Sequence, residues 1–272
     1  MQLRDLKTLD EFKQVVSLER EIWGGDYDDV VPVPTLAVTV KRGGVLIGAF
    51  ENGRMVGFVY SLPGIKDRRP IQWSHMLGVV DEYRNAGLGR TLKVEQRLRS
   101  IDIGCDLIEW TYDPMQALNA HLNFVKLGVV VEEYGINVYG DSSSKLHKGT
   151  PTDRFIAQWW IREPHVVRRI EAKSLAPLRT AEVASAPVVN RTKHRGEWLA
   201  CESYDLAREE RRLWVEIPAG FTDMLAKDPQ LALEWRMATR EIFTTYFARG
   251  YRAVDFALDR SAGRGRYLLA QT

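Results

Sequence analysis

The stretch that decides the fold is Leu77–Arg90, which reads LGVVDEYRNAGLGR. It begins as an apolar strand, crosses a short polar turn and continues as Arg84-x-x-Gly87-x-Gly89 into a helix that we expect to start near Leu88. The start of a helix leaves backbone N–H groups without partners and carries partial positive charge. Because glycine has no Cβ, a large anion can approach the backbone closely at Gly87 and Gly89. The stretch therefore predicts a phosphate or pyrophosphate site.

Other interpretations of these glycines have to be weighed. A P-loop ends in Gly-Lys-Ser/Thr, whereas Gly89 is followed by Arg90 and Thr91, which argues against a Walker-type nucleotide hydrolase. The dinucleotide fingerprint is G-x-G-x-x-G after the first strand of a parallel unit, and the pattern here has a different spacing and follows other strands. A tight turn before a helix, without any ligand, stays open as the simplest alternative.

The flanking sequence predicts the elements around this stretch. Thr8 and Glu11 fit a capping box at the start of an amphipathic helix, and Asn52-Gly53 fits the turn of a hairpin. The first three strands read as an antiparallel meander, and the strands on either side of the central helix should be parallel neighbours. The elements expected up to residue 127 are helices over 9–23, 35–41, 88–98 and 119–127, strands over 45–50, 55–62, 72–80 and 106–112, and a polar loop over 63–70.

This order of elements, together with Arg84-x-x-Gly87-x-Gly89, resembles the GNAT acyltransferase superfamily over roughly Met1 to Ile161. The resemblance implies an α/β (α+β) fold, with a mixed, mostly antiparallel sheet, a central parallel pair and flanking helices. A second segment, Asn119–Gly128, looks like a later helix of that superfamily. The chain is most similar to a branch with an added C-terminal domain. The superfamily implies acetyl-CoA or another acyl-CoA as the co-substrate.

The resemblance also implies which residues contact that co-substrate. Its phosphates would lie on the loop before the helix, and the backbone of Leu77–Val79 would face the acyl-pantetheine, with a strand bulge there to admit it. Asn119 and Asn123 would hydrogen-bond the cofactor, although helix capping and surface solvation are equally good roles for them. The cofactor-binding residues expected in this way are Leu77, Gly78, Val79, Arg84, Asn85, Ala86, Gly87, Leu88, Gly89, Arg90, Asn119, Asn123 and Phe124.

Acyl transfer to an amine needs a base, because a protonated amine cannot attack a thioester. His75 lies on the strand that leads into the loop and is the first candidate, since histidine titrates near neutral pH. The alternative is that His75 is a core residue whose ring nitrogens are hydrogen-bonded within the protein. Glu109, on the parallel strand, is the second candidate, and its alternative is a solvated or ion-paired carboxylate.

The proton donor for the leaving thiolate is the weakest part of the resemblance. Phe124 stands where the superfamily often has a tyrosine in this role, and phenylalanine has no proton to give. Tyr112 is therefore the third predicted catalytic residue, with Tyr134 and Tyr139 as alternatives. A chain without any such donor would bind CoA without transferring the acyl group.

Two polar residues are candidates for the acceptor side. Asp113 follows a parallel strand, at the end where open sheets place ligands, and is expected either to pair with a substrate amine or to form an ordinary Asp-Pro turn. Arg154 is expected either to hold a carboxylate with both prongs or to form an ion pair with Asp153 or another acid.

The charged stretch Pro164–Pro187 marks an expected domain boundary. The predicted domains are a GNAT-like acyl-CoA-binding domain over 1–162 and a smaller α/β domain over 163–272. The second contains a broadly apolar and therefore buried helix near 229–249. We expect this domain to form a substrate wall or the surface of a homodimer.

Composition limits the partners. Lys plus Arg number 38 and Asp plus Glu 36 among 272 residues, and a formal charge of +2 gives no reason to expect nucleic acid or an anionic membrane. Two cysteines, Cys105 and Cys201, make neither a disulfide framework nor a zinc site, so no metal is expected. No signal peptide or bilayer-length apolar run is visible, which favours a cytoplasmic protein. We therefore expect an N-acyltransferase that moves an acetyl or succinyl group from CoA to a small-molecule amine or amino acid, or alternatively a non-catalytic CoA-binding or sensing module.

Overall fold

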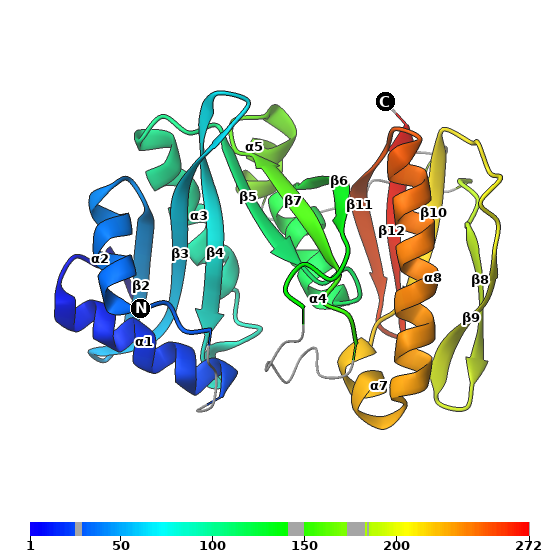
Figure 1. The fold of residues 1–272 in the computed structure, drawn as a ribbon, viewed down its shortest axis with the longest axis horizontal. Helices are drawn as coiled ribbons and strands as arrows, with labels where there is room; N and C mark the ends of the chain where they lie inside the picture. Colours follow the sequence, from blue (N-terminus) through cyan, green and yellow to red (C-terminus); the bar gives the residue numbers. More distant parts are fainter. Residues whose placement is uncertain (25–28, 141–149, 173–182, 184, 272) are drawn as a thin grey trace. The chain divides into compact units, whose positions relative to one another are not determined.

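Figure 1 shows the computed structural model of the chain, which describes residues 1–24, 29–140, 150–172, 183 and 185–271. The chain forms two compact units. Unit 1 holds the described residues of 1–110 and 160–163. Unit 2 holds the described residues of 111–159 and those from 164 onward.

Unit 1 is built on a sheet with the strand order β1-β2-β3-β4-β5. Neighbouring strands are antiparallel except for β4 and β5, which are parallel. The predicted parallel pair and the mixed, mostly antiparallel sheet are thus confirmed. The elements of this unit are β1 (Gln2–Asp5), α1 (Leu9–Trp23), α2 (Val33–Lys41), β2 (Val45–Glu51), β3 (Arg54–Lys66), β4 (Arg69–Val79), the 3₁₀ turn η1 (Asp81–Tyr83), α3 (Leu88–Asp102) and β5 (Leu107–Tyr112), whose last two residues belong to unit 2.

Two local predictions for unit 1 are confirmed. The side chain of Thr8 accepts a hydrogen bond from the Glu11 N–H, and the Glu11 carboxylate accepts one from the Thr8 N–H, which completes the capping box of α1. Asn52 and Gly53 have φ angles of 50° and 81°, as the tight hairpin turn between β2 and β3 requires.

The expected polar loop over 63–70 is wrong. β3 continues to Lys66, β4 begins at Arg69, and the chain reverses through Asp67 and Arg68, with φ angles of 49° and 63°. In this part of β3, exposed and half-buried residues alternate. The backbone hydrogen bonds between β3 and β4 continue there beyond the apolar core. The sequence has no run of apolar residues at these positions, so it does not predict the end of the hairpin.

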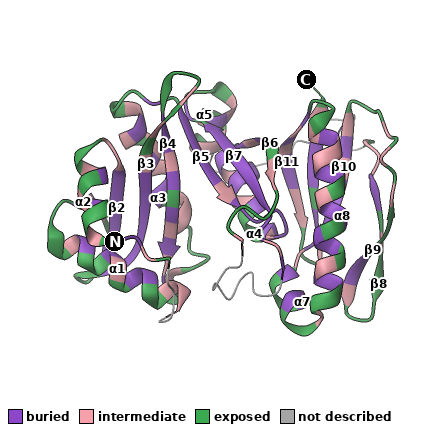
Figure 2. Cartoon of the chain, in the orientation of Figure 1, coloured by how far each residue is buried: buried purple, intermediate pink, exposed green. Residues whose placement is uncertain are grey.

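Helices α1 and α3 cover opposite faces of β3 and β4. A Cβ at Gly78 of β4 would lie 2.8 Å from Ile22 of α1, whereas one at Gly57 of β3 would lie 3.4 Å from Leu88 and Leu92 of α3. A side chain at Gly78 would therefore force neighbouring side chains, including Ile22 of α1 and Phe58 of β3, to move. Figure 2 shows the result: β2, β3 and β4 are largely buried, while the outer faces of α1 and α2 are exposed.

Unit 2 is built on an antiparallel sheet with the strand order β7-β6-β11-β12-β10, and a separate hairpin of β8 and β9. Sequence reasoning missed this hairpin, because β8 reads NRTKHR and has no apolar alternation. The elements are α4 (Ala117–Ala120), the π-helical turn η2 (His121–Leu127), β6 (Val130–Gly135), β7 (Arg154–Trp160), α5 (Pro164–Glu171), β8 (Asn190–Arg195), β9 (Trp198–Tyr204), β10 (Arg212–Pro218), α7 (Phe221–Lys227), α8 (Pro229–Ala248), β11 (Tyr251–Asp259) and β12 (Arg264–Gln271).

Helix α8 is the predicted buried helix of the C-terminal half. Its core face includes Trp235, Phe243 and Tyr246, each 0% exposed. The helix is not apolar throughout its buried part, because Arg236 is also 0% exposed. None of the described helices is both long enough and apolar enough to cross a membrane.

The domain boundary expected near residue 162 stays a prediction. β6 precedes that position and pairs with β11 through Val131 and Ala253, so unit 2 contains strands from both sides of it. Within the charged stretch on which the boundary was based, residues 173–182 and 184 lie outside the described residues.

Candidate active site

His75 is the extra residue in a bulge of β4. Tyr60 of β3 pairs with Met76, and the following Ser61 pairs with Ser74, which leaves His75 without a partner on β3. The His75 side chain is exposed, and its ring meets the Tyr60 ring edge to face with 6.0 Å between the centroids. Neighbouring protein atoms remove part of its hydration, which lowers the pKa of His75. At neutral pH the ring is therefore uncharged and accessible.

Beyond the bulge, β4 leaves β5. The last pair between the two strands joins Trp73 to Glu109, and β4 continues to Val79 with no further β5 partner among the described residues. One edge of β4 therefore keeps free backbone donors and acceptors. The bulge expected over Leu77–Val79 was misplaced, because these residues pair regularly with β3 and the extra residue is His75.

The loop after β4 is braced by Arg84. Its Nε donates to the Val79 carbonyl oxygen at 3.0 Å, and its Nη1 lies 2.6 Å from the Asp81 carboxylate. Asn85 and Gly87 have left-handed backbone conformations, with φ angles of 62° and 88°. Asparagine tolerates this region and glycine adopts it without steric cost, so these residue types suit the loop.

The N-terminus of α3 has no side-chain cap and no acidic residue in its first turn. The backbone N–H groups of residues 85–89 donate no hydrogen bond to any other described part of the chain. The backbone is not crowded at the two glycines, since a Cβ at Gly87 would meet nothing within 4 Å and one at Gly89 would meet only Leu77, at 3.7 Å. The exposed amides and the helix dipole make this a favourable place for an anion.

Sequence reasoning missed a buried lysine on the inner face of this helix. Lys93 of α3 is 3% exposed, and its Nζ donates to Ser74 Oγ at 2.7 Å and to Gln96 Oε1 at 3.2 Å. The amine also lies 3.6 Å from the centre of the Trp110 ring. Burial lowers the pKa of Lys93 well below its ordinary value. Helical spacing places Lys93, Gln96 and Ser100 on one face of α3, but it does not show that this face is buried.

Glu109 forms an ion pair rather than an open basic site. Its side chain is 6% exposed and contacts the Lys66 ammonium group of β3. This arrangement is the ion-paired alternative that the sequence left open. Glu109 is thus buried and engaged by a lysine, whereas the His75 side chain is exposed, so His75 is the better candidate for the base.

The predicted proton donors all lie in unit 2. Tyr112 is buried, its hydroxyl has no hydrogen-bond partner among the described residues, and burial raises its pKa well above the ordinary value. A higher pKa makes this hydroxyl a weaker acid. Tyr134 donates to Asp153 at 2.7 Å, and Tyr139 shares a hydrogen bond with Thr111 at 2.7 Å.

The other predicted cofactor residues of unit 2 differ in exposure. Phe124 is 0% exposed, and its ring packs against Tyr267 with 5.6 Å between centroids, so it is a core residue of this unit. Asn123 is buried and Asn119 is exposed. The loop that precedes α3 lies in unit 1, and the contact of these residues with a shared cofactor stays a prediction.

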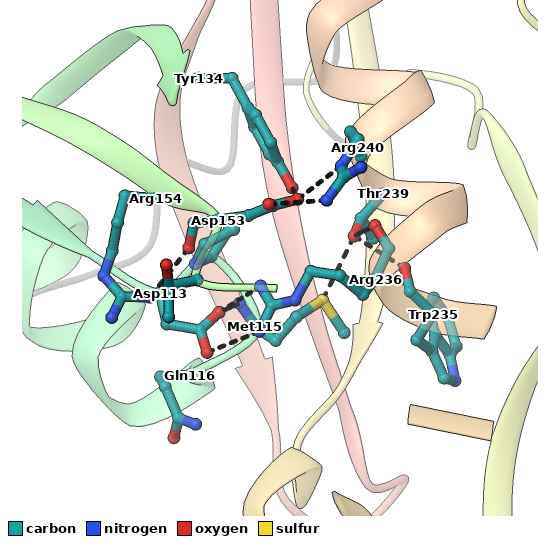
Figure 3. A network of polar contacts seen from close by, with 12 residues as sticks. Asp113, Met115, Gln116, Tyr134, Asp153, Arg154, Trp235, Arg236, Thr239 and Arg240 are labelled. Carbon is teal, nitrogen blue, oxygen red and sulfur yellow. Dashed lines mark hydrogen bonds and ion pairs between the residues drawn. The ribbon is translucent and has the colours of Figure 1, made fainter. Parts of the chain in front are cut away.

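A cluster of buried charges lies in unit 2 around Asp113 and Asp153 (Figure 3). Arg236 donates from Nη1 and Nη2 to the two Asp113 oxygens at 2.6 and 2.8 Å. Arg240 donates from Nε and Nη2 to the two Asp153 oxygens, both at 2.8 Å. Asp113 is therefore engaged by an arginine instead of standing free for a substrate amine. Arg154 does not pair with the Asp153 carboxylate but donates to its backbone carbonyl oxygen at 3.0 Å.

Comparison with known proteins finds similar solved structures. No protein-family model matches the sequence, and a search of curated proteins finds no match. A GNAT-family acetyltransferase from Streptococcus pneumoniae matches with a TM-score of 0.47 and 16% identity, over 58% of this chain and 97% of that one. Aminoglycoside 6′-acetyltransferase type Ii matches with a TM-score of 0.48 and 16% identity, over 60% and 99%.

A third similar structure is the NatC complex bound to Gag peptide and CoA, with a TM-score of 0.46 and 13% identity over 58% of this chain and 96% of that chain. Identities of 13–16% and TM-scores below 0.5 make this a likeness of fold alone. What the structure itself confirms is the expected mixed, mostly antiparallel sheet with a parallel pair. About two fifths of the chain lies outside these matches. No group of His, Cys, Asp and Glu in the described part of the chain is arranged to hold a metal ion.

Proposed function

We propose that this chain transfers an acyl group from acyl-CoA to the amine of a small molecule or an amino acid. The observation that carries the proposal is the start of α3, where the amides of residues 85–89 donate no hydrogen bond within the described chain and the backbone at Gly87 and Gly89 is not crowded by other residues. A pyrophosphate has several acceptor oxygens and a negative charge, which match the free donors and the positive end of the helix dipole. The free edge of β4 after Trp73 offers backbone groups for the amides of a pantetheine arm.

His75 is the proposed base. The reaction forms a bond between the amine nitrogen and the thioester carbonyl carbon, breaks the carbon–sulfur bond, and moves one proton from the amine to a base. An uncharged imidazole accepts that proton, and the lowered pKa of His75 keeps the ring uncharged at neutral pH. The thiolate that leaves takes up a proton, for which we propose no side chain, because Phe124 has none and the pKa of Tyr112 is raised.

The alternative function is a CoA-binding or sensing module without catalysis. Phe124 favours it, since this residue is buried against Tyr267 and replaces the tyrosine that the GNAT resemblance places at this position. Both functions share the start of α3 as the binding site. They differ only in whether the bound thioester is consumed.

Thermal unfolding in the presence of ligands tests the binding step. Acetyl-CoA at about a hundred times its Kd should stabilise the protein by about 2.7 kcal/mol, because it binds only the native state. ATP and NAD at the same concentration should stabilise it less. If acetyl-CoA, succinyl-CoA and CoA all leave the unfolding temperature unchanged, both functions are refuted.

Release of free thiol from acyl-CoA, measured with a panel of amines and amino acids, separates the two functions. An amine-dependent release supports the transferase, and binding without release supports the sensor. In the transferase, His75→Gln should lower kcat by about a hundredfold or more. It should also remove the limb of the pH–rate profile that rises at a pH below the ordinary histidine pKa of 6.5. A variant that keeps this limb would exclude His75 as the base.

A further inference from the structure

Among the described residues, Arg154 is a buried cation that has no carboxylate partner of its own. The residue is 7% exposed and lies at the start of β7. Its one side-chain hydrogen bond goes from Nη1 to the Asp153 carbonyl oxygen, and its Cζ lies 5.2 Å from the centre of the half-exposed Tyr139 ring. The other guanidinium nitrogens have no partner in the described chain, yet they are not sealed from solvent. Arg154 therefore presents free donors at the edge of the buried cluster.

The charges around Arg154 leave one positive charge unbalanced. Asp113 is matched by Arg236 and Asp153 by Arg240, each through two hydrogen bonds. Arg154 is the third guanidinium beside these two carboxylates, and no other acidic residue among those described acts on it. Arginine stays charged at physiological pH even though burial lowers the pKa of Arg154. A buried charge without a counter-ion is unfavourable, and an external anion would remove that cost.

Further donors beside Asp113 lack acceptors. The Nε of Arg236 and the Nε2 of Gln116 are both buried without a hydrogen-bond partner in the described chain. The other amide atom of Gln116, Oε1, accepts from Thr222 at 3.1 Å, which orients the amide. Figure 3 shows Arg154 and Gln116 close to Asp113. An excess of donors over acceptors indicates a ligand that supplies acceptors.

We propose that Arg154 and Gln116 bind the carboxylate of a small organic acid, with the Asp113–Arg236 ion pair as their support. The planar fork of a guanidinium matches the two oxygens of a carboxylate. A carboxylate group is planar like the guanidinium and brings one negative charge to the single unbalanced positive charge, whereas a phosphate group is tetrahedral. The site is formed by residues of unit 2 alone and does not depend on CoA binding or acyl transfer.

Binding of sodium succinate to the full chain, followed by thermal shift at constant ionic strength, tests the site. The wild type should bind succinate saturably, and Arg154→Met should raise its Kd by roughly tenfold to a hundredfold, since hydrogen bonds to a charged partner are lost. The matched control is Arg252→Met, which removes the same charge from an exposed arginine of β11 that pairs with Glu132 at 3.0 Å. This control should bind succinate like the wild type.

The stability of the unliganded variant distinguishes binding from a structural role. Arg154→Met should unfold at or above the wild-type temperature, because it removes an unpaired buried charge. The proposal is overturned if succinate binds Arg154→Met and the wild type equally, if the wild type does not bind it, or if inorganic phosphate binds in preference. Should Arg154→Met fail to fold, Gln116→Leu provides the test: we expect a three- to tenfold rise in the succinate Kd, and an unchanged Kd would overturn the proposal.

Discussion

Helices α1 and α3 lie in the same unit and each has 15 residues, but they begin in opposite ways. At α1, the Glu11 carboxylate accepts from the N–H groups of Lys7 and Thr8 at 2.7 and 2.9 Å, and the Thr8 hydroxyl accepts from the Glu11 N–H at 3.3 Å. At α3, the N-cap is Gly87, which has no side chain, and the amides of residues 85–89 donate no hydrogen bond within the part of the chain that the structure describes.

The difference shows where the chain satisfies a helix start by itself and where it leaves the start for a ligand. Burial alone would raise the pKa of Glu11, but the Arg4 guanidinium and the N–H groups of Lys7 and Thr8 lower it to about 2. The Glu11 carboxylate is therefore charged at neutral pH and accepts hydrogen bonds from the N–H groups at the start of α1. A side-chain cap contributes about 1 kcal/mol, so its absence at α3 is a small cost in stability that keeps the amides available for an anion.

A carboxylate placed at the start of α3 should have the largest effect. Gly89→Asp should lower CoA affinity at least a thousandfold, which corresponds to about 4 kcal/mol, because its charge would face the pyrophosphate. The unliganded protein should stay folded, since a Cβ at Gly89 meets only Leu77 at 3.7 Å and an acidic side chain suits a helix N-terminus. Calorimetric titration with CoA measures the affinity.

The matched control for this variant is Gly220→Asp. Gly220 is at the start of another helix, α7, of which it is the N-cap, and a Cβ there would meet only Trp198, at 3.8 Å. It should bind CoA like the wild type. Equal CoA affinity in Gly89→Asp and Gly220→Asp would contradict the proposal that CoA binds at the start of α3.

The C-terminal half of α1 carries a carboxyl group whose pKa is raised, whereas the pKa of Glu11 is lowered. Glu19 is 0% exposed, and burial raises its pKa to about 7 although Oε2 accepts from the Val31 N–H at 2.8 Å. A raised pKa in the folded state means that its stabilising contribution is complete below pH 4.5 and is lost as the pH rises through about 7. The loss amounts to about 3 kcal/mol at most.

Denaturant unfolding at several pH values measures this contribution. The free energy of unfolding of Glu19→Gln should change less between pH 4.5 and 8 than that of the wild type. The reason is that an amide has the shape of the neutral acid but does not titrate. Glu11→Gln is the control, since the lowered pKa of Glu11 places its effect between pH 4.5 and about 2, where stability is lost as the pH falls. A Glu19→Gln variant with the wild-type pH dependence would contradict the raised pKa.

Removal of the α1 cap should have the smallest effect. Thr8→Ala should destabilise the protein by about 1 kcal/mol, because the Glu11 N–H loses its acceptor. CoA affinity should not change, and thermal unfolding with and without CoA measures both quantities. Ser17→Ala, on the exposed side of the same helix, should cost less than about 0.5 kcal/mol. A loss of CoA affinity in Thr8→Ala would mean that the two helix starts are not independent.

Much of unit 1 was predictable because its decisive features are local. The capping box at Thr8, the Asn52-Gly53 turn and the glycines before α3 each depend on residues a few positions apart. The position of the bulge was not predictable, because β4 reads as a regular strand and only its register with β3 shows that His75 is the extra residue. The burial of Lys93 also depends on packing between α3 and the sheet.

The sequence by itself determined the loop before α3 and the free start of that helix, since backbone φ preferences and missing caps act over a few residues. Only the tertiary structure decided which buried charges meet. Asp113 and Asp153 pair with Arg236 and Arg240 of α8, far along the chain, and Arg154 is left without a carboxylate partner among the described residues. Charge pairing depends on distances of a few ångströms between distant segments, which no local pattern encodes.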